Sequence, residues 1–342
     1  MSATASLIVT LTPAPTLDRT YFVTNLVSGA VNRADSVGEE LAGKGINVSR
    51  GLHLAGVANI GIVPIGNADP AVLARTGSSD FLHPLWVDGT LRVSTTILEN
   101  GGTTTKINET PRPLSEDDWN AVVDLTVKTV RESGAKWLVI AGALPTYKET
   151  GTPVELDSLF DKMKSLGVKT ALDTSGDALT YWAKRGTATM MKPNTEELAS
   201  IVGRNLFTIG DVIDAAREVN SYGVELVLAS LGADGMVAVT KDAAWSSKTD
   251  AVRVINTVGA GDATLAGFLT AVVENPVAAG ELDHGLDYNV AIGVKTAVQW
   301  GALAVTQPTS GLTSVGNLPT SYLYENPERS TPLDEPAIGK PS

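Results

Sequence analysis

The chain lacks cysteine and any long apolar run. Without cysteine it can have neither a disulfide, nor a thiolate nucleophile, nor a cysteine-ligated metal, and this fits a cytoplasmic protein. Residues 1–11 have no basic start and no long apolar core, so we expect them not to be a signal peptide. No window has the length and apolarity of a membrane span.

Clustered positive charge is also missing. The 26 Lys and Arg residues are outnumbered by 38 Asp and Glu, for a net charge of −12. This argues against a nucleic-acid partner, because phosphate backbones need clustered cations. Any phosphate ligand must therefore be attracted by local cations rather than by the global charge. With 342 residues, 43% of them apolar, the chain can build one large domain with a sizeable core.

What is present is an alternation of short apolar runs with helical patterns. Runs of strand length lie at 6–11, 57–65, 137–140, 169–172, 188–191 and 225–229. Helical patterns start near Ile46 and cover 117–133, 153–166 and 209–222. Buried strands that alternate with helices predict an α/β fold, with a mostly parallel sheet covered by helices on both faces. Ligands of such sheets bind at the carboxyl ends of the strands.

Two segments, at about 14–41 and 88–112, interrupt this alternation with extended, partly polar chain. Apolar and polar residues alternate on both sides of Asn100-Gly101-Gly102, which predicts a hairpin. These strands fit either a small separate sheet or an ordinary surface hairpin. We expect residues 1–325 to form a single domain. Residues 326–342 contain Pro327, Pro332, Pro336 and Pro341 with few large apolar residues, and we expect a loosely ordered tail.

The most informative motif is N-T-V-G-A-G-D, at 256–262, which precedes a helical pattern of small and apolar residues. Glycines let a backbone approach a ligand closely, and a helix start offers unpaired N–H groups to an anion. Asp262 at the rim of such a turn can take a proton from a hydroxyl. A plain structural turn is the alternative. A dinucleotide fingerprint, and with it an NAD-dependent dehydrogenase, would need a third glycine where Thr264 stands.

A second motif, A-G-K-G-I-N, occupies 42–47 and also precedes a helical pattern. Residues 38–44 fit the start of a P-loop, but Gly45 stands where a P-loop needs Ser or Thr. Glu39 and Glu40 would also repel a triphosphate. Small residues with one cation and one amide suit a polyhydroxyl or sugar-phosphate ligand better.

Together the two motifs resemble the PfkB, or ribokinase-like, family of carbohydrate kinases, in its phosphofructokinase branch. Further matching segments follow in order, at Pro15–Thr20, Thr105–Glu109, Leu172–Gly176, Lys192–Leu198 and Ser230–Gly232. The resemblance covers about residues 7–315. It implies a ribokinase-like fold, in which the two interrupting segments form a small β lid over the sugar site, often with a dimer contact.

The resemblance also implies a role for individual residues. Asp262 would be the catalytic base, and the N–H groups of Gly259, Ala260 and Gly261 would stabilise the transferring phosphoryl group. The substrate would be bound by Asp18, Gly43 and Asn47, with Arg33, Lys44, Arg92 and Lys106 neutralising its phosphate. The nucleotide would lie near Lys192, Asn194, Ser230, Gly232 and Gly235.

The implied cofactors are ATP and Mg²⁺, and the resemblance also admits a monovalent cation, K⁺. Asn194 and Glu197 would hold Mg²⁺ through water. The alternative for Glu197 is an acid that merely favours the start of a helix. The resemblance implies a phosphosugar and ATP as ligands, no membrane partner, and a homodimer through the lid.

Several positions depart from the family pattern, chiefly at the sugar site. Ala14, Ala42, Ser94 and Ala143 stand where the family carries other residues. The added methyl of Ala42 matters if that residue needs a positive φ. The transfer machinery is thus intact while the sugar pocket is altered.

We therefore expect ATP-dependent, Mg²⁺-dependent phosphorylation of a phosphorylated ketohexose, fructose 1-phosphate to fructose 1,6-bisphosphate. The alternatives are a tagatose 6-phosphate or fructose 6-phosphate kinase, or a non-catalytic phosphosugar-binding homologue.

Overall fold

A ten-stranded sheet forms the centre of the molecule in the computed structural model, which describes residues 7–78, 80–277, 286, 288–307, 309 and 311–339. Its strands lie in the order β15 (Ser321–Glu325), β14 (Ala244–Thr249), β13 (Met236–Val239), β12 (Leu226–Ser230), β10 (Met190–Met191), β9 (Lys169–Asp173), β8 (Trp137–Ala141), β1 (Ile8–Leu11), β4 (Asn59–Gly66) and β5 (Leu82–Val87). From β12 to β5 all neighbours are parallel, whereas β13, β14 and β15 add antiparallel strands at one edge. The predicted mostly parallel sheet is confirmed.

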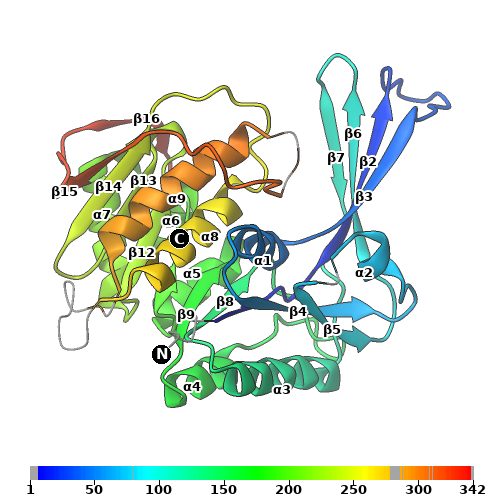
Figure 1. Cartoon of the computed structure of the whole chain (residues 1–342), viewed down its shortest axis with the longest axis horizontal. Helices are drawn as coiled ribbons and strands as arrows, with labels where there is room; N and C mark the ends of the chain where they lie inside the picture. The colour runs from blue at the N-terminus through cyan, green and yellow to red at the C-terminus, as the bar shows by residue number, and fades with distance from the viewer. Residues whose placement is uncertain are drawn as a thin grey trace.

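Helices cover both faces of this sheet (Figure 1). One layer contains α3 (Glu116–Ser133), α4 (Asp157–Ser165), α5 (Gly176–Arg185), α6 (Thr195–Val202) and α7 (Ile209–Ser221), and the other contains α1 (Lys44–Leu54), α8 (Ala260–Glu274) and α9 (Val290–Val305). Alternate residues of a strand enter the two cores: Leu138 and Ile140 pack with the first layer, Val139 with the second. Because both faces are buried, the central strands are mostly apolar.

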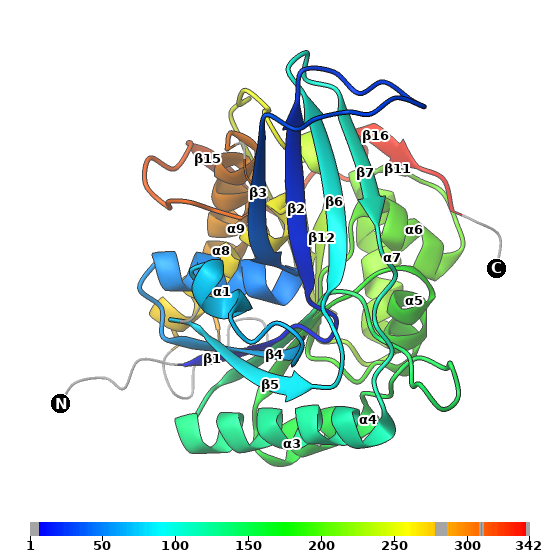
Figure 2. The ribbon, with the colours of Figure 1, turned by 90° about the vertical axis from the view of Figure 1, so that its right-hand side faces the viewer.

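A second sheet of four strands stands out from the main body in Figure 1, and Figure 2 shows these strands side by side. Its order is β3 (Ser36–Ala42), β2 (Thr16–Val23), β6 (Arg92–Glu99) and β7 (Thr104–Asn108), and we call it the small sheet. It comes from the two segments that interrupt the alternating pattern. The hairpin around Asn100-Gly101-Gly102 is present, with Leu98 opposite Thr104. Short elements at the margins are α2 (Val72–Arg75) and the 3₁₀ turn η1 (Gly232–Asp234).

The C-terminal segment is ordered, contrary to our expectation, over its described residues 326–339; residues 340–342 lie outside the described residues. Its strand β16 (Pro332–Ala337) pairs with β11 (Leu206–Thr208) in a two-stranded sheet. Prolines are tolerated there because β16 pairs on one side only. The tail also caps α7, whose Ile209 N–H donates to Thr331 O at 2.9 Å. Prolines at the edge of a sheet were therefore misinterpreted as a sign of disorder.

We expect Leu333→Ala in β16 to lower the free energy of unfolding by about 2–3 kcal/mol. Leu333 is only 6% exposed and packs in the same core as α6 and α7. Ile338 is 76% exposed, so Ile338→Ala serves as a control with almost no effect. Chemical denaturation of the three proteins measures the difference, and equal stabilities would show that the tail contributes nothing by its packing.

In the described part of the chain, every helix is too short or too polar to cross a bilayer.

Candidate functional site

A cavity of about 530 Å³ lies between the small sheet and the carboxyl ends of the central parallel strands. Most of the predicted site residues line it: Asp18, Gly43, Lys44, Asn47, Arg92, Lys106, Lys192, Asn194, Glu197, Ser230, Gly259, Gly261 and Asp262. Four others do not line it, namely Arg33, Ala260, Gly232 and Gly235. Residues far apart in sequence thus converge at the edge of the sheet where the fold predicts a ligand.

Gly43 and Gly45 allow α1 to begin directly against the end of β1. Gly43 has φ 143°, and a Cβ there would lie 2.6 Å from Thr12 Cγ2. At Gly45 a Cβ would lie 2.4 Å from Thr12 Oγ1. Ala42 ends β3 and is not among the residues with positive φ, so its methyl is accommodated. The glycines of this motif therefore serve close packing, which places the next side chains, Lys44 and Asn47, at the cavity.

The start of α8 forms the opposite wall of the cavity. Gly259 adopts the left-handed conformation, with φ 82°, immediately before the helix. A Cβ on Gly261 would lie 3.1 Å from Lys192 Nζ, so the ammonium group rests against this turn. A helix start beside an ammonium group is a favourable place for a phosphoryl group. Ala260 contributes less than expected, because its N–H already donates to Thr257 O at 3.4 Å.

Asp262 stands in the first turn of α8 and is only 6% exposed. Asn47 holds its carboxylate by donating from Nδ2 to Oδ2 over 2.8 Å. Burial, with Asp173 as a second cause, raises the pKa of Asp262 to about 6, against the opposing effects of Asn47, Lys44 and Lys192. A carboxylate with a pKa just below neutrality is suited to general-base chemistry.

Asp173 is a site residue to which sequence reasoning gave no role. It ends β9 and is 1% exposed, with Lys44 Nζ 2.6 Å from Oδ1 and Lys192 Nζ 3.0 Å from Oδ2. Burial opposes its ionisation, but the two lysines outweigh burial and lower the pKa of Asp173. The available signal was an acid at the carboxyl end of a buried strand. Lys44 therefore forms an ion pair with Asp173, and a ligand phosphate would not be its only partner.

The small sheet contributes a polar face to the cavity. Asp18, Ser94 and Asn108 lie opposite one another on adjacent strands, and all three line the cavity. Thr16 Oγ1 donates to Ser94 Oγ at 3.0 Å. Sequence reasoning gave a binding role to Asp18 and singled out Ser94 as a departure from the family pattern at the sugar site. It did not single out Thr16 or Asn108, because side-chain alternation is informative only once the register is known.

One carboxylate oxygen of Asp18 is an acceptor without a partner among the described residues. Its Oδ1 is buried and has no hydrogen bond to any described residue. Burial and then Glu40 raise the pKa of Asp18 to about 6, against the effects of Arg92 and Lys106. A buried acceptor that the protein leaves unsatisfied needs a donor from outside, such as a hydroxyl group.

Arg92 joins the small sheet to the main body. Its guanidinium donates to Ala14 O at 2.9 Å, to Pro15 O at 3.3 Å and to Glu109 O at 3.1 Å. These contacts fix its position while it still lines the cavity. Arg33, by contrast, lies exposed in the connection between β2 and β3 and does not line the cavity.

Asn194 and Glu197 form the capping box of α6. Glu197 N–H donates to Asn194 Oδ1 at 2.8 Å, and Asn194 N–H donates to Glu197 Oε2 at 2.9 Å. Both side chains nevertheless line the cavity. Within the described residues, no three acidic or histidine side chains are grouped to hold a metal directly.

Close packing explains why one position of the turn after β12 is a glycine. A Cβ on Gly235 would lie 2.1 Å from Ser247 O, so no other residue fits there. Ser230 lines the cavity, whereas Gly232 lies beside Glu335 of the C-terminal strand.

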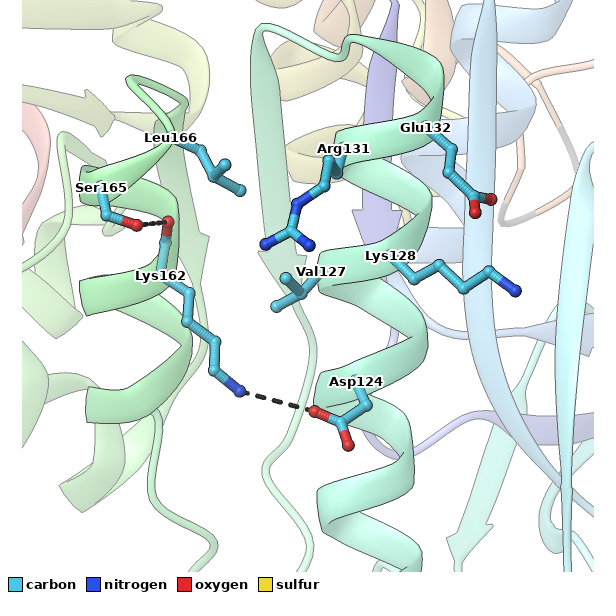
Figure 3. A pocket seen from close by; sticks show the side chains of 8 residues that line it. All are labelled: Asp124, Val127, Lys128, Arg131, Glu132, Lys162, Ser165 and Leu166. Carbon is cyan, nitrogen blue, oxygen red and sulfur yellow. Dashed lines mark hydrogen bonds and ion pairs between the residues drawn. The ribbon is translucent and has the colours of Figure 1, made fainter.

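A second hollow, of about 470 Å³, lies between α3 and α4 (Figure 3). Its lining includes an ion pair of Lys162 with Asp124, at 3.5 Å, whose side chains are 42% and 77% exposed. Exposed pairs of this kind are weak and solvated, so this groove offers no organised chemistry.

Known proteins resemble this chain over nearly its whole length. Residues 14–315 match the pfkB family carbohydrate kinase domain, a range that contains every residue that lines the cavity. The 1-phosphofructokinase of Haloferax volcanii is 35% identical over 312 residues, 88% of this chain and 93% of that protein. That of Rhodobacter capsulatus is 32% identical over 308 residues, 88% of this chain and 92% of that protein. The crystal structure of phosphofructokinase-2 from Escherichia coli in complex with potassium has a TM-score of 0.77 and 26% identity, covering 90% of this chain and 96% of that one.

Proposed function

This chain belongs to the pfkB family of carbohydrate kinases, and on that premise we propose that it phosphorylates fructose 1-phosphate to fructose 1,6-bisphosphate with ATP. The observation that carries the proposal is Asp262, a buried carboxylate held by Asn47 at the start of α8. It shares one cavity with Asp18, Arg92 and Lys106 of the small sheet. Relatives named 1-phosphofructokinase, with up to 35% identity, support the choice of sugar.

The proposed reaction uses the two walls of the cavity differently. Asp262 accepts the proton of the attacking sugar hydroxyl, whose oxygen bonds to the γ-phosphorus as the bond to ADP breaks. The N–H groups of Gly259 and Gly261, together with Lys192, stabilise the charge on the transferring phosphoryl group. Asp18 accepts from a sugar hydroxyl, while Arg92 and Lys106 neutralise the phosphate that the substrate already carries. Asn47 orients Asp262, and Gly43 lets the sugar approach α1.

The cofactors in this proposal are Mg²⁺-ATP and K⁺. Mg²⁺ keeps several waters and prefers phosphate oxygens, so it needs few protein ligands. Asn194 and Glu197 fit this demand, because the capping box occupies only one carboxylate oxygen of Glu197. When bound, Mg²⁺ supplies charge neutralisation on the ATP phosphates. Ser230, Gly232 and Gly235 would lie near the nucleotide. Support for K⁺ is limited to the potassium complex of the E. coli protein. The cytoplasm is the compartment in which we place this ATP-dependent reaction.

A panel of sugars tests the proposal. We expect ADP release from Mg²⁺-ATP to be fastest with fructose 1-phosphate, compared with fructose 6-phosphate, tagatose 6-phosphate, fructose and ribose. Preference for one of the other phosphosugars would retain the kinase and point to Ala14, Ser94 and Ala143 as the specificity residues. No turnover with any sugar, but binding of fructose 1-phosphate in calorimetry, would support the non-catalytic alternative.

The small sheet is proposed to act as a lid and as the contact of a homodimer. The face turned away from the cavity carries Val37 and Ile107, 51% and 61% exposed, beside Tyr21 and Ile97. An apolar face of this kind is typical of an interface between protein chains.

We expect the double variant Val37→Asp, Ile107→Asp to sediment as a monomer, whereas the unaltered chain sediments as a dimer. Two carboxylates placed in an apolar interface would lose their hydration without a partner. Replacing Leu166 and Tyr181, which are also exposed but lie on the main body, is the matched control. A variant that still sediments as a dimer would locate the interface elsewhere.

A further inference from the structure

Asp173 lies at the centre of a charge cluster drawn from five parts of the chain. Lys44 comes from the first turn of α1 and Lys192 from the segment after β10, and both ammonium groups bond to Asp173 at the end of β9. Asp262, from α8, acts electrostatically on Lys44, and so does Glu197, from α6. Asp173, Lys192 and Asp262 are 1%, 5% and 6% exposed.

The geometry makes Asp173 the link between the two lysines. Its two oxygens hold one ammonium group each, at 2.6 and 3.0 Å. Lys192 Nζ is at the same time placed against Gly261, on the turn of α8. Without a carboxylate between them, two neighbouring ammonium groups would repel each other in a poorly hydrated place. Asp173 therefore decides where both cations stand relative to the helix start.

We propose that Asp173 is a positioning residue of phosphoryl transfer, which holds Lys44 and Lys192 on either side of the transferring group and acts through its field on Asp262. The inference rests on the proposed function of the cavity. Lys44 Nζ and Lys192 Nζ lie 2.6 and 3.0 Å from the two oxygens of Asp173, so we expect this residue to act on the transferring group through these ion pairs. Its removal therefore affects the chemistry through three other residues.

The negative charge of Asp173 shifts the pKa of Asp262 in a definite direction. A neighbouring negative charge opposes the ionisation of Asp262, and a neighbouring positive charge favours it. Asp173 is among the causes that raise the pKa of Asp262, and Lys44 and Lys192 are among those that lower it. Asp173→Asn should thus make Asp262 more acidic, whereas Lys44→Met should make it less acidic. A variant that merely loosened the cavity would not produce two shifts of opposite sign.

The experiment compares wild type with Asp173→Asn, Asp173→Glu and Lys44→Met. In kcat against pH at saturating substrates, we expect the acid limb of Asp173→Asn to move down by about one pH unit. That of Lys44→Met should move up. The plateau kcat of Asp173→Asn should fall by roughly 10²-fold, because Lys192 is no longer held at the turn of α8. Asp173→Glu, which keeps the charge, should retain the position of the acid limb. An acid limb that stays in place or moves up in Asp173→Asn would overturn the proposal.

A second measurement separates this proposal from the assignment of the substrate. Titration of the Asp262 carboxyl by ¹³C NMR needs no turnover, so it remains valid if the sugar panel identifies another substrate or none. We expect a lower pKa of Asp262 in Asp173→Asn and a higher one in Lys44→Met. Should Asp173→Asn fail to fold, Lys44→Met still tests the sign, and a lowered pKa there would contradict the proposal.

Discussion

Asp262→Asn is expected to lower turnover by about 10²–10⁴-fold while leaving ATP affinity nearly unchanged. The amide keeps the size of the carboxylate and can still accept from Asn47, whose Nδ2 lies 2.8 Å from Asp262 Oδ2. What it loses is the ability to accept the proton of the attacking hydroxyl. ADP release measures turnover, and calorimetry measures ATP binding. Near-normal turnover would remove Asp262 as the base.

The pH dependence gives this variant an internal check. Burial raises the pKa of Asp262 from 3.8 to about 6, so its basic form disappears as the pH falls through about 6. The kcat of wild type should fall over the same range, and Asp262→Asn should lack that limb. Asp18 also has a pKa raised to about 6, and its protonation should act on KM for the sugar instead. Asp124→Asn, in the groove between α3 and α4, is the control and should show the wild-type profile.

Arg92→Ala is expected to raise KM for the phosphosugar by roughly 30- to 1000-fold, corresponding to about 2–4 kcal/mol. The variant removes a charge that faces the substrate phosphate. It also removes three hydrogen bonds that tie the small sheet to residues 14, 15 and 109. KM for ATP should change by less than about threefold, because the nucleotide side contains none of these contacts.

Two further variants make this prediction specific. Arg92→Lys should lie between wild type and Arg92→Ala, since an ammonium group keeps the charge but not the planar fork. Arg112, which pairs with Glu109 on the surface, offers a matched control in Arg112→Ala, which should behave like wild type. Equal effects of Arg92→Ala on both substrates would place its role in folding rather than in sugar binding.

The sequence was sufficient for the fold class and for those strands and helices whose signals are local. The apolar run at 169–172 indicates β9, and the pattern at 117–133 indicates α3, since both faces of the sheet are covered. Polar alternation around Asn100-Gly101-Gly102 likewise indicates the hairpin of β6 and β7. The C-terminal strand could not be found in this way. Its few apolar residues do not predict a strand by themselves. The strand forms through contacts with β11 and α7, which lie far away in sequence.

The same distinction applies to the cavity. Gly43 and Asp262 belong to motifs that can be recognised from the spacing of their residues in the sequence, and both residues line the cavity. Asp173 is a single acid after an apolar strand, and nothing nearby in sequence indicates that two lysines converge on it. Ser94 and Asn108 depend on register in the same way. Charge clusters and rows of side chains on neighbouring strands form only when distant segments come together in the fold, so a local sequence pattern does not predict them.

The pairing of β16 with β11 has a consequence for how the protein is made. Leu206 of β11 is translated about 130 residues before its partner Ala337, which at about 5–20 residues per second takes roughly 7–26 seconds. During that interval β11 has an unpaired edge, and the first N–H groups of α7 lack their acceptors, the carbonyl groups of Thr331 and Arg329. A variant truncated before β16 would leave this edge unpaired, and an unpaired edge favours aggregation.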